Sequence, residues 1–174
     1  MKEAEGSSGR VTYNFFDLNA KLKFKLRENT TFYISYYEGQ DNFGDETNSD
    51  SRQDSVIVFE NFQSEWSWGN RILSSRLSSK LSQNLFVNAT AYYSRFGFDA
   101  FKNEQASFTV NDEFGGLAYT GSLFQSRISD LGLRLDFNYN ANNRNQMQFG
   151  FDVVRHQFDP GLAVVNESSD LIEE

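Results

Sequence analysis

The sequence predicts an all-β protein, an antiparallel meander of long hairpins. Several segments alternate apolar and polar side chains strictly, which is the period of a strand with two different faces. The 174 residues include 18 Phe and 8 Tyr, and large flat side chains suit a pleated surface. Very short polar turns join consecutive alternating segments, as in hairpins. A helix would need apolar residues three or four apart, so none is expected here.

The first predicted hairpin begins at residues 16–26, "FDLNAKLKFKL", where every even position is apolar. The odd positions are polar and include Lys21, Lys23 and Lys25. After a turn at about residues 27–30, "TFYISYY" alternates in the same way. Residues 38–56 are rich in Asp, Asn and Ser and have no period, so they are expected to form a long loop, with a short strand at "VIVFENF".

The second predicted hairpin joins "WGNRILSSRLSSKLS" to "LFVNATAYY" through the dipeptide "QN". Its first strand sets leucines on one face against Arg76 and Lys80 on the other. Residues 99–120 follow as a second long, glycine-containing loop, in which "ASFTV" is expected to form a short strand.

The third predicted hairpin, "DLGLRLDFNYN" to "MQFGFDVVRHQF", has the clearest alternation. Odd positions are apolar from residue 131 to 139, and the polar register holds Asp130, Arg134, Asp136 and, in the second strand, His156. We therefore expect a disordered segment at residues 1–12, a body of three long hairpins at 13–161 and an acidic tail, a truncated extracellular loop, at 162–174.

Three features favour a partial transmembrane β-barrel wall over a soluble sheet. The first strand alternates over eleven residues, where soluble strands average about 5–6 and membrane strands need about 9–11. Connections alternate between very short and very long, as in outer-membrane barrels. Aromatic residues gather near strand ends, where their rings suit the headgroup zone; they are Tyr13, Phe15, Phe16, Phe43, Trp66, Trp68, Phe96, Phe98, Phe101 and Tyr139.

Two other architectures share the same alternation. A soluble β-sandwich or small β-barrel acting as a binding module would turn the apolar face inward as its core. A small closed membrane barrel would need two more strands, for which residues 56–59 and 108–110 are the candidates. In the barrel-wall prediction, even residues 16–26 and odd residues 131–139 face lipid.

The opposite register is predicted to face an aqueous lumen or plug. It contains Lys21, Lys23, Lys25, Arg76, Asp130, Arg134, Asp136 and His156. Asp130, Arg134 and Asp136 share one face of one strand, and charge pairing across strands inside the wall is expected for them, rather than a solute path. His156 is the only histidine, and it is expected to be a hydrogen-bonding residue.

Composition excludes several classes of function. The net charge is -8 and no basic cluster is present, so nucleic acid is not an expected partner. The chain has no Cys, which removes disulfides, cysteine zinc sites and thiol catalysis. Acidic residues at 41–54 do not have the spacing of a calcium-binding loop. We therefore expect no catalysis, no cofactor and no bound metal.

The three hairpins also resemble a known family. "YNFFDLNAKLKFKLRENTTFYISYYEGQDNF", "WGNRILSSRLSSKLSQNLFVNATAYYSRFGF" and "ISDLGLRLDFNYNANNRNQMQFGFDVVRHQFDPG" are similar to barrel hairpins of TonB-dependent outer-membrane receptors. The resemblance covers residues 13–161. It implies a parent barrel of about 22 strands with an internal plug. Such a receptor imports a nutrient with energy from an inner-membrane complex.

The chain departs from that plan in size. Its six long strands are fewer than the roughly eight that close the smallest outer-membrane barrels, and no plug segment precedes residue 13. We therefore expect an internal barrel fragment located in the outer membrane. Its expected partners are outer-membrane lipid, the rest of the barrel and plug, and, through the parent, the inner-membrane energy-coupling complex. The ligand is expected to be an iron chelate, glycan or peptide that meets the long loops first.

Overall fold

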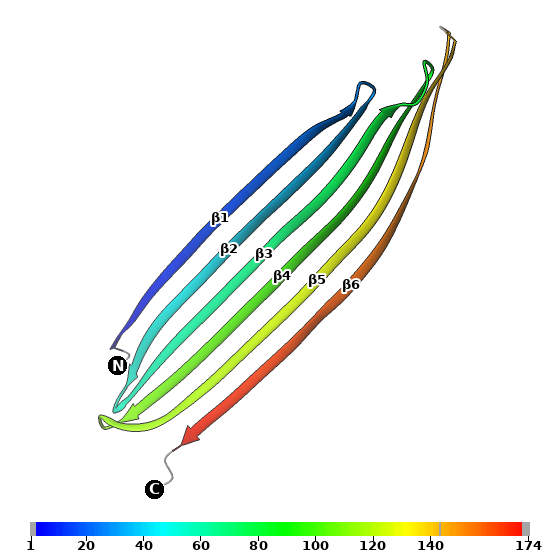
Figure 1. Cartoon of the computed structure of the whole chain (residues 1–174). Coiled ribbons are helices and arrows are strands. Elements are labelled where there is room, and N and C mark those ends of the chain that lie inside the picture. The colour runs from blue at the N-terminus through cyan, green and yellow to red at the C-terminus, as the bar shows by residue number, and fades with distance from the viewer. Residues whose placement is uncertain (1–2, 143, 172–174) are drawn as a thin grey trace.

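The computed structural model describes residues 3–142 and 144–171 as one antiparallel sheet (Figure 1). Its six strands follow chain order, so every neighbour in the sheet is also a neighbour in sequence. The strands are β1 (Glu3–Arg27), β2 (Thr30–Gln53), β3 (Val56–Lys80), β4 (Leu85–Val110), β5 (Glu113–Asn142) and β6 (Asn145–Leu171). The predicted all-β meander of long hairpins is confirmed.

The strands are much longer than the alternating segments from which they were predicted. Both expected long loops are strand instead, because residues 38–53 belong to β2 and residues 99–110 and 113–120 belong to β4 and β5. The chain reverses in two-residue turns after β2 and after β4. Asp54, Asn111 and Asp112 in these turns have positive φ, a conformation that Asp and Asn adopt more readily than most residues. Apolar and polar residues alternate along a strand only when its two faces meet different surroundings. A strand with water on both faces therefore shows no such alternation.

The strand ends also differ from the prediction. β1 starts at Glu3 and pairs with β2 from there, so residues 3–12 are not disordered. β6 continues to Leu171, paired with β5, where an acidic loop was expected from residue 162. Backbone pairing with a neighbouring strand orders these polar segments although they bury little apolar surface. Residues 1–2 and 172–174 lie outside the described residues.

The sheet is open, with β1 and β6 at opposite edges (Figure 1). The small closed barrel is therefore ruled out, and its two candidate strands are parts of β3 and β4. The single sheet is not a sandwich either, since the described residues include no buried hydrophobic side chain. The 25 residues of β1, at about 3.3 Å each, extend roughly 80 Å, far more than a hydrocarbon layer of about 30 Å.

Cross-strand register assigns every side chain to one of two faces. Leu22, Ala89, Leu133 and Phe151 share the side that we call the apolar face. The opposite side, which carries Arg134, is called the charged face. The assignment holds across all six strands because paired residues point to the same side of a sheet.

The apolar face is apolar only in the half of the sheet near the turns at residues 28–29 and 81–84. There it exposes large side chains, including Leu133 and Phe149 at 59% each. The last apolar row is Tyr36, Leu73, Tyr93 and Leu131, which pair in register across β2 to β5. The next row on the same face is Glu38, Arg71, Arg95 and Ser129. On β2 to β5 the apolar band thus ends along one line, and on β4 it covers residues 85–93. On β1 the band continues to Leu18 and Phe16, and on β6 it ends at Val153, one row earlier.

Most of the aromatic residues expected in a lipid-facing girdle lie on the wrong side for that role. The adjacent Phe15 and Phe16 point to opposite faces, and β1 pairs with β2 there without a bulge. Seven of the ten lie on the charged face: Tyr13, Phe15, Phe43, Trp66, Trp68, Phe96 and Phe98. Together with Phe124 of β5 they form an aromatic stripe on the charged face. The stripe lies farther than the apolar band from the turns at residues 28–29 and 81–84.

Candidate functional site

The eight residues predicted to face a lumen all lie on the charged face. Three are on β1, one on β3, three on β5 and one on β6: Lys21, Lys23, Lys25, Arg76, Asp130, Arg134, Asp136 and His156. Residues from distant parts of the sequence are thereby brought onto one surface. That this surface lines a lumen stays a prediction.

Three of these cations surround one aromatic ring that the sequence analysis did not single out. Lys21 Nζ and Lys23 Nζ lie 5.5 and 5.9 Å from the centroid of the Tyr33 ring, and Arg76 Cζ lies 4.8 Å from it. Tyr33 pairs with Lys23 on β1 and with Arg76 on β3. The electron-rich ring face attracts all three cations. The β1–β3 side of the charged face is consequently positive.

The β5–β6 side carries the acidic residues, one histidine–aspartate hydrogen bond and one ion pair. His156 Nδ1 lies 2.8 Å from Asp130 Oδ1 across the two strands, so the histidine is hydrogen-bonded as expected. Arg134 Nε donates to both oxygens of Asp136 at 3.1 and 3.0 Å. That second pair runs along β5, not between strands as predicted, because residues two apart share a face.

A shallow polar groove of about 480 Å³ lies between the positive and acidic sides. It is lined by Arg76, Asn88, Thr90, Tyr92, Arg134, Asp136 and Asp152. Gly132 lies under the ring of Tyr92, and a Cβ at this glycine would collide with that ring. Guanidinium, amide, hydroxyl and carboxylate groups line the groove, which therefore suits water or a hydrophilic solute.

The aromatic stripe extends the charged face away from the short turns. Phe43 and Trp66 have ring centroids 5.5 Å apart, and Phe98 and Phe124 have theirs 6.2 Å apart. In the same row as Phe43, Tyr13 donates its hydroxyl to the Asp41 carboxylate. The signal in the sequence was the Phe15–Phe16 pair, where the apolar residues change from odd to even positions.

The hydrogen bond to Asp41 raises the pKa of Tyr13 above its ordinary value, with smaller contributions from burial and from the charges of Asp41 and Asp17. A carboxylate favours the protonated phenol, since the phenolate can no longer donate. The pKa is raised by folding, so this contact stabilises the sheet fully below the unfolded pKa of about 10. The stabilisation is lost as pH rises through the folded pKa.

Substituting Asp41→Asn should lower the pKa of Tyr13 toward that of a free tyrosine, because the charged acceptor is removed. The measurement is a pH titration of the ring carbon bearing the hydroxyl, by NMR on tyrosine-labelled protein with Tyr13→Phe for assignment. Asp45→Asn removes an equal charge from β2 without touching the Tyr13 hydroxyl and is the matched control. An unchanged Tyr13 pKa in Asp41→Asn, or an equal fall in the control, would contradict the contact.

The described residues contain neither a metal-binding cluster nor a membrane-spanning helix. No group of three or more His, Asp or Glu side chains in residues 3–142 and 144–171 is arranged to hold a metal ion. No helix in the same residues is long and apolar enough to cross a membrane.

Comparison with known proteins gives matches only among solved structures. No family model matches the chain, and no curated protein does. Among solved structures, the FrpB iron transporter from Neisseria meningitidis overlaps 94% of this chain and 43% of its own, at 8% identity and a TM-score of 0.20. The ferric preacinetobactin receptor BauA of Acinetobacter baumannii overlaps 97% and 44%, at 10% identity and 0.21.

The outer membrane channel DcaP of Acinetobacter baumannii overlaps 87% of this chain and 62% of its own, at 9% identity and a TM-score of 0.17. These weak structural neighbours are outer-membrane receptors, transporters and channels. The chain spans less than half the length of the first two.

Proposed function

We propose that this chain is a segment of an outer-membrane β-barrel wall, and specifically of a TonB-dependent receptor that takes up a nutrient such as an iron chelate, glycan or peptide. The observation that carries the proposal is the apolar band. It crosses all six strands on one face of a single sheet, while the other face at the same height is charged.

Lipid is the solvent that suits the apolar band. Leu131, Leu133 and Phe149 are 56%, 59% and 59% exposed, and no second layer covers them in the described residues. Exposed to water, such area costs about 25 cal/mol for each Å² left unburied. Residues 85–93 of β4 match the roughly 9–11 residues with which a tilted strand crosses the hydrocarbon. The parts of the strands beyond the band extend into water.

The open edges support a larger barrel. In hydrocarbon, each unpaired N–H or C=O on the outer edges of β1 and β6 costs several kcal/mol. Those edges therefore need partner strands wherever they cross the bilayer. We propose that the remaining strands of a parent receptor supply the partners and close the wall.

The finer assignment to TonB-dependent receptors rests on the resemblance of the three hairpins. Under this proposal the charged face turns toward the lumen and plug, and the polar groove lies on the solute side of the wall. The aromatic stripe lies farther out, near the predicted extracellular end, where rings and acids meet ligand before the groove does. Energy arrives from the inner-membrane complex through the parent. Catalysis and nucleic-acid binding form no part of the proposed function.

Refolding the full chain from denaturant tests the membrane part of the proposal. We expect β-structure, read by circular dichroism, to form with phosphatidylcholine vesicles, where copies of the chain can pair edge to edge in place of the parent's strands. Residues 16–40 and 129–157 should then be protected from added protease. Detergent-free buffer without vesicles should give aggregates, because both edges and the apolar band are uncovered. A folded monomer in that buffer would overturn the proposal and favour a soluble binding module.

Sequencing the coding region on both sides of the segment tests the receptor part. We expect an open reading frame that continues into a plug-type domain upstream and further alternating strands downstream. Flanking strands without a plug would contradict the TonB-dependent assignment while leaving the barrel wall intact. A start and a stop codon directly bordering the 174 residues would contradict the proposal that the chain is a segment of a larger barrel.

A further inference from the structure

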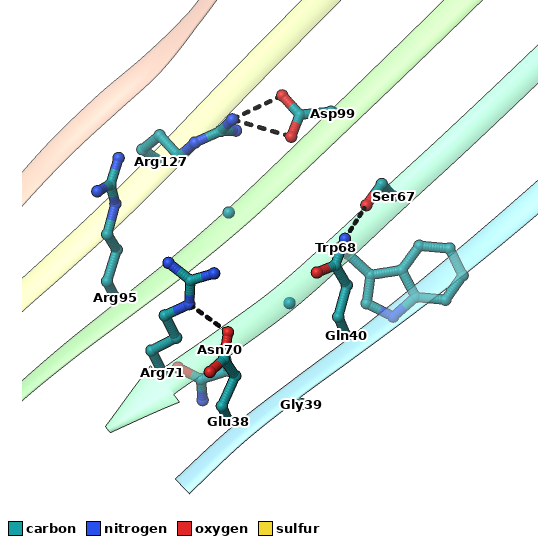
Figure 2. Close-up of a pocket in the computed structure, with 12 residues that line it drawn as sticks. Glu38, Gly39, Gln40, Ser67, Trp68, Asn70, Arg71, Arg95, Asp99 and Arg127 are labelled. Carbon is teal, nitrogen blue, oxygen red and sulfur yellow. Dashed lines mark hydrogen bonds and ion pairs between the residues drawn. The ribbon is translucent and has the colours of Figure 1, made fainter. Parts of the chain in front are cut away.

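We propose that Arg71, Arg95 and Arg127 form a binding site for the phosphate of an anionic lipid headgroup. The inference rests on the proposed membrane placement and adds a specific lipid contact to it. The three arginines lie on the apolar face of β3, β4 and β5. All three line one hollow of the sheet surface, and Figure 2 shows their side chains rising from neighbouring strands.

The hollow has a volume of about 250 Å³ and a floor made by two glycines. Gly69 and Gly97 pair across β3 and β4, one row beyond Arg71 and Arg95. Neither presents a side chain to the apolar face, so a depression remains between the arginines. Arg127 pairs with Gly97 and lies over it, where an added Cβ would come within 3.2 Å of the arginine side chain.

Two of the three arginines are positioned by carboxylates. Arg71 Nε lies 2.6 Å from Glu38 Oε1. Arg127 Nη2 donates to both oxygens of Asp99 at 2.7 and 2.9 Å, and its Nη1 donates to the Phe98 carbonyl at 2.9 Å. These contacts hold both guanidinium groups beside the hollow (Figure 2).

The third arginine, Arg95, differs from the other two in its contacts. Within residues 3–142 and 144–171, the Arg95 side chain makes no ion pair or hydrogen bond, and it is exposed. Arg95 is the direct cross-strand partner of Arg71 on the same face, an arrangement of like charges that costs stability. A bound anion would remove that cost and use the five N–H donors of Arg95.

The local charge is positive in a chain whose net charge is -8. Three arginines against Glu38 and Asp99 leave one positive charge at the hollow. On β6, Arg155 and Asp159 border the cluster and cancel each other in charge. Electrostatics therefore favours an anion here, and planar guanidinium groups match phosphate oxygens in bidentate geometry.

Position selects the lipid headgroup over a free anion. Arg71 and Arg95 form the row next to Leu73 and Tyr93, the last apolar residues of the band on β3 and β4. A bilayer whose hydrocarbon covers the band places its phosphates at this height. Its acyl chains would then lie against the leucine and tyrosine side chains below. Pairing with Glu38 and Asp99 explains why two arginines are present, but not why Arg95 is.

The test uses the full chain inserted in phosphatidylcholine nanodiscs that contain a minor fraction of phosphatidic acid. Native mass spectrometry then counts the phosphatidic acid molecules that stay bound to the protein when it is released from the nanodiscs. We expect Arg95→Gln to weaken retention about tenfold, the size of one lost charge-assisted contact. Arg95→Lys should retain an amount of phosphatidic acid between those of Arg95→Gln and the unchanged protein. Lysine keeps the positive charge but cannot bind phosphate in the bidentate geometry of a guanidinium. Arg52→Gln removes an equal charge far from the band and should retain lipid like the unchanged protein.

Two results would overturn the lipid site. One is equal retention by Arg95→Gln and Arg52→Gln. The other is displacement of phosphatidic acid by millimolar inorganic phosphate, which would make the hollow a site for the free anion. Failure of the proposed function is seen separately, because insertion into pure phosphatidylcholine vesicles does not depend on Arg95. A chain that fails to insert there overturns both proposals, and one that inserts without selecting phosphatidic acid overturns only the site.

Discussion

Substituting Ala89→Arg should lower the free energy of unfolding in a bilayer by about 2–4 kcal/mol, the cost of an arginine on the lipid face near the midplane. Ala89 pairs with Leu77 and Leu135 and lies halfway along the apolar band on β4. The neighbouring Asn88→Arg should change the free energy of unfolding by less than about 1 kcal/mol. Asn88 points to the charged face and pairs with Asp136, a favourable neighbour for a cation.

The measurement is urea unfolding of the full chain in phosphatidylcholine vesicles, followed by the fluorescence of its two tryptophans. The two variants add the same side chain at adjacent positions, so chain length, charge and strand propensity are matched. Equal effects would show that neither face meets lipid. The reverse order would place the charged face against the hydrocarbon and overturn the proposed orientation.

Substituting Gly150→Ala should destabilise the β5–β6 pair by roughly 1–3 kcal/mol, as overpacking does. A Cβ at Gly150 would collide with the Leu135 carbonyl oxygen and lie 3.2 Å from the Asp136 Cα. Both atoms belong to the β5 backbone, which cannot move aside without breaking cross-strand hydrogen bonds. A flexible side chain, by contrast, could rotate away.

Gly9→Ala is the matched control because the same methyl group would meet only the Glu46 carbonyl at 3.7 Å and the Thr47 hydroxyl at 3.8 Å. Its effect should stay within about 0.5 kcal/mol. The same urea titration compares the two variants, and hydrogen exchange of β6 amides locates the change. A stability loss of equal size in both would mean that strand propensity, and not the contact with β5, decides the cost.

Local sequence patterns predicted the strands and their two faces in the half of the sheet near the turns at residues 28–29 and 81–84. Strict alternation assigned Lys21, Lys23 and Lys25 to one side of β1 and Leu22 and Phe24 to the other. Alternation is a local property of the extended backbone, so it is readable without knowing any partner strand. The three short turns and the chain order of the strands followed from the same local signals.

The register between strands could not be read from the sequence, because it depends on hydrogen bonds between distant segments. Residues 38–53 carry no alternation because both faces are polar, yet pairing with β1 and β3 makes them strand. Asp130 and His156 are 26 residues apart and become partners through the β5–β6 register. The arginine cluster of Arg71, Arg95 and Arg127 arises in the same way, and so does the aromatic stripe. Hydrogen bonding between strands determines which distant residues share a row and a face.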